Sequence, residues 1–136
     1  MAPPKTRIHN LEQKKTATEK NNTENQPPSF SFRYLVKHTD FCYDSLNKTH
    51  KVALIDTLYR LSQLTWSVLR STHCHGLGFE KIERNALNFS LPNEVPNDYN
   101  IIAFRFCGKA PMLGYRSSDG IFYIIAFDSK FKAYKH

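Results

Sequence analysis

The chain has 136 residues, which is room for one domain, and its 40% hydrophobic and 23% charged residues allow a packed core. Lysine and arginine number 19 against 12 aspartate and glutamate, and the formal charge of +7 favours attraction to polyanions such as nucleic acid. No run of 18 apolar residues occurs, which excludes a membrane-spanning helix. Residues 1–15 lack the apolar segment of a secretory signal, so we expect no membrane partner.

The cysteine content restricts the compartment and the means of stabilisation. Cys42, Cys74 and Cys107 are odd in number and lie far apart along the chain. Small secreted domains stabilised by disulfides carry paired, closely spaced cysteines. We therefore expect no disulfide framework, and a reducing cytoplasmic location.

Residues 1–28 differ in composition from the rest of the chain. Prolines and polar residues fill this segment, and Ile8 and Leu11 are its only large aliphatic residues after Met1. Such a segment cannot bury enough apolar surface to offset its ordering entropy, which predicts a disordered basic tail. The tail is either a basic arm that touches nucleic acid or a partner, or simply a solvated end. Residues 29–136 are expected to form a single domain, and 14 basic against nine acidic residues place most of the excess charge there.

The first part of this domain predicts a strand and then a helix. Residues 29–37 are rich in Phe, Tyr and Val and predict the first strand. Residues 49–72 predict one long amphipathic helix, because polar side chains recur along it at alternating spacings of four and three. The remaining helix surface is so broadly apolar that it needs cover on two sides, by a sheet and by a second helix, the tail or a partner protein. The polar stripe consists of Asp56, Arg60, Gln63, Ser67 and Arg70.

The C-terminal part predicts an antiparallel β-meander that packs on the helix, so the expected fold class is α+β. Residues 121–127 are apolar on both faces and predict an interior strand, and Asp119-Gly120 before them suits a tight turn. Residues 79–89 are ambiguous between a strand and an irregular segment, and residues 92–98 predict a loop. The other expected strands are residues 101–107, 112–116 and, as a short fourth strand, 131–134.

Metal chemistry has one candidate in this sequence, the run from His73 to Gly76. Its His-Cys-His side chains lack the second pair of ligands at a defined spacing that zinc sites normally have. A histidine-rich helix end is also favoured by the helix dipole alone. No nucleophile-elbow, phosphate-loop or HExxH motif occurs, so we predict neither a metal nor a cofactor.

A basic, aromatic sheet face is the most informative feature of the C-terminal part. Six basic and two acidic residues follow residue 102. Alternation along residues 101–107 puts Arg105 on the face away from Phe104 and Phe106, which is the open face if the helix covers the phenylalanines. Basic side chains hold phosphates and aromatic rings stack on bases, so this face suits RNA. The same pattern is equally expected if the arginines are ordinary surface residues and the tyrosines lie at the edge of the core.

The order of elements resembles the RelE/YoeB superfamily of bacterial toxins. The local similarity lies in Phe104-Arg105-Phe106, in Gly114-Tyr115-Arg116, in the Asp119-Gly120 turn and in the final segment IIAFDSKFKAYKH. The resemblance implies a small basic endoribonuclease that cleaves mRNA without a metal, in some cases on the ribosome, and that is inhibited by an antitoxin, here expected to be acidic. It also implies catalytic roles for Arg105, Arg116, Tyr134 and His136. The residues expected to bind RNA beside them are Tyr115, Lys130, Lys132 and Lys135.

Two features depart from that family, and two other functions stay open. The family has a hairpin of two helices after its first strand, where this sequence predicts one helix, and Asp128 stands where a basic residue is expected. The first alternative is a non-catalytic RNA- or protein-binding module that uses the same basic face. The second is an interaction protein whose apolar helix flank docks on a partner. Whether the protein is an enzyme is left open by the sequence.

Overall fold

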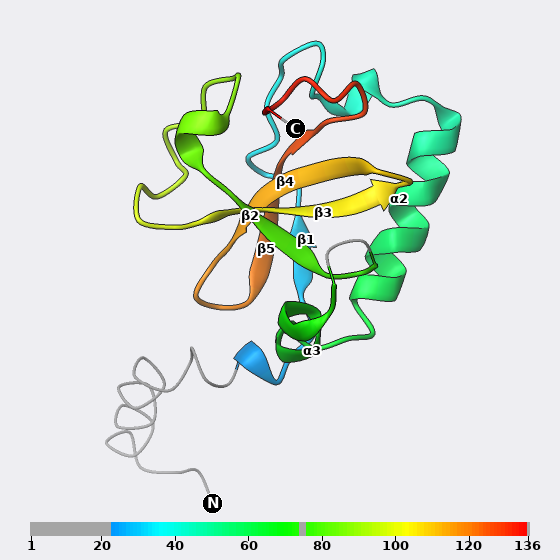
Figure 1. Ribbon diagram of the computed structural model, residues 1–136, viewed down its shortest axis with the longest axis vertical. Coiled ribbons are helices and arrows are strands. Elements are labelled where there is room, and N and C mark those ends of the chain that lie inside the picture. The colour runs from blue at the N-terminus through cyan, green and yellow to red at the C-terminus, as the bar shows by residue number, and fades with distance from the viewer. Residues whose placement is uncertain (1–22, 74–75, 136) are drawn as a thin grey trace, which may run out of the picture.

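The computed structural model describes residues 23–73 and 76–135, and within them one five-stranded sheet with helices on one side (Figure 1). The strand order is β1-β5-β4-β3-β2. β1 runs parallel to β5, and the other neighbours are antiparallel. The expected α+β class is confirmed. The strands are β1 (Ser29–Ser31), β2 (Phe79–Ile82), β3 (Ile101–Cys107), β4 (Ala110–Arg116) and β5 (Ile121–Phe127), and the helices are α2 (Lys48–Leu61) and α3 (Trp66–Ser71), with short 3-10 turns at Tyr43–Ser45 and Arg84–Ala86.

The meander follows the sequence prediction closely. β3 and β5 have the predicted bounds, and β5 lies between β1 and β4 as its two apolar faces require. The prediction of a first strand over residues 29–37 was too long. Ser31 accepts a hydrogen bond from the Arg33 backbone, and the chain turns at Phe32, whose carbonyl accepts from the Leu35 backbone. The strand therefore ends at Ser31.

The prediction of one long helix over residues 49–72 was wrong. The structure has two helices separated by a turn, because the Thr65 side chain caps the start of α3 by accepting a hydrogen bond from the Val68 backbone. The turn buries Trp66 against the sheet, where its indole donates to the Gly120 carbonyl at 3.0 Å. The 4-3-4-3 spacing of polar side chains runs through this turn without a visible interruption.

Two hydrophobic cores form, one on each face of the sheet. On the helix side, Leu54, Leu61 and Trp66 pack against aromatic residues of the sheet such as Phe104 and Phe122. The opposite face was expected to be open. Loops cover much of it, and the second core includes Phe41, Val95, Leu113, Tyr115, Ile125, Ala133 and Tyr134.

The segment from Thr23 to Pro28, predicted to belong to the disordered tail, packs against the domain. Thr23 is buried, and the Gln26 carbonyl accepts a hydrogen bond from the Trp66 backbone. Residues 1–22 lie outside the described residues, so a disordered basic tail stays a prediction there. In the described part of the chain no helix is long and apolar enough to cross a membrane.

The C-terminal segment after β5 is a loop, so the predicted fourth strand over residues 131–134 was wrong. Only one isolated bridge forms, between Leu87 and Tyr134. Phe131 has a positive φ of 58°, which a strand cannot accommodate. The loop instead folds back over the face of the sheet opposite to the helices, where Ala133 and Tyr134 join the second core.

Candidate functional site

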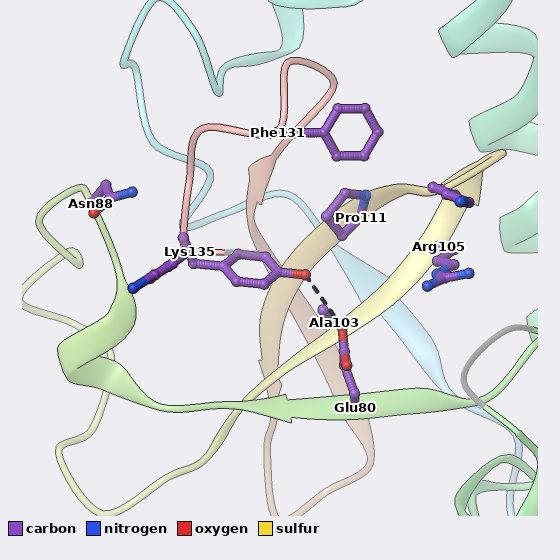
Figure 2. A pocket seen from close by; sticks show the side chains of 9 residues that line it. Glu80, Asn88, Ala103, Arg105, Pro111, Phe131 and Lys135 are labelled. Atoms are coloured by element: carbon purple, nitrogen blue, oxygen red, sulfur yellow. Dashed lines mark hydrogen bonds between the residues drawn. The ribbon is translucent and has the colours of Figure 1, made fainter.

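A cavity of about 730 Å³ lies on the sheet face opposite to the helices, where the C-terminal loop passes over β2, β3 and β4 (Figure 2). It combines charged, aromatic and small side chains from four segments of the chain. Ala103 forms part of the floor, and the Tyr134 side chain is hydrogen-bonded to Glu80 within the cavity lining. The lining residues are Glu80, Asn88, Ala103, Arg105, Lys109, Pro111, Phe131, Tyr134 and Lys135.

Strand pairing brings the acid and the arginine of this cavity to the same face of the sheet. Glu80 on β2 is in register with Ala103 on β3, and Arg105 is two residues further along β3. Residues two apart on a strand share a face, so Glu80, Ala103 and Arg105 lie on one side. Lys109 lies in the tight β3–β4 turn with Gly108, which has a positive φ of 57°.

Glu80 and Tyr134 form the central polar contact of the cavity. The Tyr134 hydroxyl donates to a Glu80 carboxylate oxygen at 3.3 Å, which Figure 2 marks with a dashed line. Tyr134 is only 7% exposed. Burial, together with the negative charge of Glu80, raises the pKa of the Tyr134 phenol well above its usual value of 10. The hydroxyl therefore keeps its proton at neutral pH and acts as a hydrogen-bond donor.

Three cations surround this pair, and Glu80 is the only acid in the lining. Within the described part of the chain, Arg105, Lys109 and Lys135 have no carboxylate partner within ion-pair distance. An unpaired guanidinium beside two ammonium groups in a concave surface attracts anions and offers several donors to a phosphate. The cavity is thus suited to hold a phosphorylated ligand.

Arg116, predicted to act beside Arg105, lies on the opposite face of the sheet. Its guanidinium sits over the Trp66 ring at 4.7 Å, donates to Glu24 at 2.5 Å and donates to Thr23 at 2.7 Å. Glu24 also forms an ion pair with Arg70. The donors of Arg116 are therefore engaged within the fold, so the structure does not bring it to the cavity.

Tyr115 shares the face of Arg105 but lies in the second core rather than in the cavity. It is 5% exposed, its ring stacks on Tyr123 with centroids 5.2 Å apart, and it meets the Tyr99 ring edge-on. Burial raises the pKa of its phenol. A ring enclosed in this way cannot stack on a nucleic-acid base, so the expected RNA contact at Tyr115 is not available.

The C-terminal lysines are divided between the cavity and its surroundings. Lys135 lines the cavity, whereas Lys130 pairs with Asp40 at 2.8 Å, a contact that lowers the pKa of the Asp40 carboxyl. Lys132 is exposed outside the lining. His136 lies outside the described residues, so its predicted catalytic role is still a prediction.

Asp128, which departs from the family pattern, has a structural explanation. It is fully buried, and its carboxylate accepts a hydrogen bond from the Lys132 backbone at 2.7 Å. Its own backbone N–H donates to the Pro111 carbonyl. Asp128 therefore fixes the loop that lines the cavity, and no basic residue could make this contact.

Sequence reasoning missed Glu80, Lys109, Asn88 and Phe131 as lining residues. Glu80 lies next to Lys81 and Glu83, and that charged cluster is typical of an exposed surface. Its contact with Tyr134 joins residues 54 positions apart in the sequence. Only the pairing of β2 with β3 brings them together, and no local pattern reports that pairing.

Neither a metal site nor a similarity to a known protein assigns a function to this cavity. Within residues 23–73 and 76–135, no group of three or more His, Cys, Asp or Glu side chains could hold a metal ion. Cys74 and His75 of the candidate metal run lie outside these residues. Comparison with known proteins finds no matching family model, no similar curated protein and no similar solved structure.

Proposed function

We propose that this protein is a metal-independent endoribonuclease that binds and cleaves single RNA strands in the cavity formed by Glu80, Arg105 and Tyr134. The observation that supports this proposal is the meeting of a carboxylate, an unpaired guanidinium and a protonated phenol in one basic cavity. Cleavage of RNA next to a 2′-hydroxyl needs a base, a cation for the developing charge on phosphorus and an acid for the leaving oxygen. These side chains supply all three.

In the proposed reaction Glu80 accepts the proton of the 2′-hydroxyl as its oxygen bonds to phosphorus. Arg105 stabilises the additional negative charge on the phosphoryl oxygens, and the bond from phosphorus to the 5′-oxygen breaks. Tyr134 donates its proton to that leaving oxygen and regains one from Glu80 along their hydrogen bond. The products are a 2′,3′-cyclic phosphate and a 5′-hydroxyl, and no metal or oxidant is needed.

The resemblance to RelE/YoeB toxins adds the biological setting of this proposal. It suggests mRNA as the substrate, in some cases on the ribosome, and a cytoplasmic toxin with an acidic antitoxin as its inhibitor. The site proposed from the structure uses Arg105 and Tyr134, as the resemblance implies. It keeps the expected Lys135, leaves out Arg116, Tyr115, Lys130 and Lys132, and adds Glu80 and Lys109.

The test is a cleavage assay on labelled single-stranded RNA in the presence of excess EDTA. We expect wild-type protein to yield cyclic-phosphate ends, and Glu80→Gln to lower the rate by roughly 100-fold or more, in the range of a lost general base. Arg60→Ala is the control, because it removes an exposed cation from the helix layer. Salt-sensitive binding without cleavage by the wild type would favour the non-catalytic binding module instead.

A second candidate function, docking of a partner protein, is favoured by the outer face of α2. Val52, Ile55 and Tyr59 are each more than 60% exposed and share one side of the helix. Phe32 and Tyr43 extend this apolar face. Contiguous exposed apolar surface of this kind marks interaction sites.

The positive charges around this face favour an acidic partner. Lys48 and Lys51 border the apolar side chains of α2, and the Lys51 ammonium lies 4.4 Å from the Tyr43 ring. We propose that the occupant is an amphipathic helix with an apolar stripe and acidic flanks, because the lysines would pair with its carboxylates. A second copy of this basic chain would bring like charges together.

Titration calorimetry with a synthetic helix of roughly 20 residues, with leucines on one face and glutamates beside them, tests this candidate. We expect binding to wild-type protein and at least tenfold weaker binding to Ile55→Asp, with Arg60→Ala unchanged. Equal binding to Ile55→Asp, or concentration-dependent self-association through this face, would contradict it.

A further inference from the structure

The cations that line the cavity are divided between two ends of it. β2 and β3 are antiparallel, so Phe79 at the start of β2 lies opposite Phe104, the neighbour of Arg105. β2 therefore begins beside Arg105 and runs away from it. Lys109 lies in the turn that follows β3, beyond Arg105, so these two cations form one end of the cavity.

Lys135 lies at the other end. The segment that follows β2 contains Leu87, which forms a β-bridge with Tyr134. Lys135 comes directly after Tyr134 and is exposed, so its ammonium group is accessible to a ligand. Figure 2 shows Lys135 and Arg105 on opposite sides of Glu80. A ligand that contacts both cations therefore has to pass over the carboxylate that lies between them.

The contact between Glu80 and Tyr134 gives this path a direction. The Tyr134 backbone is at the end of the cavity where Lys135 lies, and its hydroxyl reaches Glu80 at 3.3 Å. In the proposed reaction Tyr134 protonates the 5′-oxygen of the leaving nucleoside, while Arg105 holds the phosphate that is cleaved. The leaving nucleoside therefore lies on the Lys135 side of that phosphate.

The chemistry of Lys135 suits the next group along such a strand. An RNA strand continues from the leaving nucleoside through its 3′-oxygen to another phosphate. A lysine ammonium is a point charge with three donors on a flexible stem, so it can bind phosphate oxygens in several orientations. Among residues 23–73 and 76–135, no carboxylate lies within ion-pair distance of Lys135.

We propose that Lys135 forms a second phosphate subsite, which binds the phosphate on the 3′ side of the leaving nucleoside. Arg105 and Lys109 hold the phosphate that is cleaved. This assignment rests on the function proposed above, because the direction of the strand follows from the roles of Tyr134 and Arg105. The preferred substrate is then an RNA strand that continues in the 3′ direction beyond the cleaved bond, so the protein cleaves within strands rather than removing a 3′-terminal nucleoside.

Cleavage of three short RNAs tests the subsite: mixed-sequence dinucleotides without a terminal phosphate, with a 3′-phosphate and with a 5′-phosphate. For the wild type we expect the 3′-phosphate to raise kcat/KM about fivefold, the upper range for one exposed ion pair. Lys135→Ala should reduce this gain to less than about twofold, and Lys135→Arg should retain it because it keeps the charge. A 5′-phosphate should give no gain that depends on Lys135.

Lys132→Ala is the matched control, because Lys132 is exposed on the same loop but lies outside the cavity lining. It should retain the full gain from the 3′-phosphate. An equal loss of the gain in Lys132→Ala and Lys135→Ala would overturn the subsite, since it would show an effect of net charge alone. A gain from the 5′-phosphate that depends on Lys135 would also overturn it.

Binding of the 2′-O-methyl forms of the same dinucleotides, measured by NMR titration, separates the subsite from catalysis, because these probes cannot be cleaved. A preference for the 3′-phosphate form that depends on Lys135, without cleavage of unmethylated RNA, would overturn the catalytic proposal and leave the subsite standing. Cleavage together with equal affinity for the forms with and without the 3′-phosphate would overturn the subsite alone. No binding of any form at low salt would overturn both.

Discussion

Arg105 and Arg116 are the same residue type on neighbouring strands of one sheet, yet their surroundings are opposite. Arg105 lies in a cavity with unpaired lysines and has no carboxylate partner in the described part of the chain. Arg116 lies on the other face, over Trp66 and against Glu24. The difference teaches that a basic residue in a strand is informative about ligands only once its face and its partners are known. A cation already satisfied by the fold stabilises the fold, whereas an unsatisfied one is available to a ligand.

The largest effect on stability is expected at Arg116. Arg116→Ala removes charged hydrogen bonds and the contact with the Trp66 ring, at a site where both partners are about three-quarters buried. We expect a loss of about 2–3 kcal/mol in the free energy of unfolding. Urea denaturation measures it, with Arg105→Ala as the matched variant, which should stay within about 0.5 kcal/mol of the wild type. Equal losses at the two arginines would contradict the comparison.

Substitution of Glu24, the acid that pairs with Arg116, tests the same comparison. Glu24→Ala leaves Arg70 and Arg116 without their shared carboxylate, and we expect a loss of about 1 kcal/mol in unfolding free energy. The two freed guanidinium groups should also raise the affinity for RNA at low salt, in an increment that disappears at high salt. Fluorescence anisotropy at two salt concentrations checks this. Unchanged affinity at low salt would contradict the view that the ion pair with Glu24 keeps Arg116 from binding RNA.

A pH dependence is expected from Tyr134 in the cavity. Because the pKa of its phenol is raised in the folded state, the unfolded chain loses this proton first when the pH rises above 10. Stability linked to Tyr134 is therefore fully present below pH 10 and is lost as the pH rises towards the folded value. Thermal melts between pH 9 and 11 should show a steeper decline for the wild type than for Tyr134→Phe. Equal declines of the wild type and Tyr134→Phe would contradict a raised pKa of the Tyr134 phenol.

The smallest effect is expected at the surface pair of Arg60 with Asp56 on α2. Its atoms are 3.9 Å apart and both side chains are more than half exposed. Arg60→Ala should change the unfolding free energy by less than about 0.5 kcal/mol and leave RNA cleavage unchanged. A clear loss of cleavage in Arg60→Ala would show that net charge, rather than the cavity, governs the interaction with RNA.

Local sequence patterns predicted the strands of the meander. They did not predict the break between α2 and α3, which depends on long-range packing. The alternation and composition of β3 and β5 are strong enough to predict both strands to the residue. The break between α2 and α3 left no trace in the polar spacing, because it depends on the Thr65 cap and on the burial of Trp66 against a sheet formed later in the chain. Helix periodicity cannot detect a turn that preserves the phase of the polar residues.

The site was only partly predictable for a related reason. Arg105 and Tyr134 were predicted as site residues, and they do line one cavity. The face of Arg116 depends on the register in which Phe104 lies opposite Met112, which puts Arg116 on the side of Phe104 and away from Arg105. A β3–β4 turn one residue longer or shorter would place Arg116 on the same face as Arg105. Glu80 is brought in by a strand whose pairing partner lies more than 20 residues away.

The most direct test of the central claim compares cleavage of single-stranded RNA by Arg105→Ala and Arg116→Ala, at a temperature at which both variants are folded. If the cavity is the catalytic site, Arg105→Ala loses roughly 100- to 1,000-fold in rate, the range for removal of a group that stabilises the transition state. Arg116→Ala stays within about threefold of the wild type, a change smaller than 1 kcal/mol in barrier height. A loss in Arg116→Ala that equals or exceeds the loss in Arg105→Ala would contradict the account.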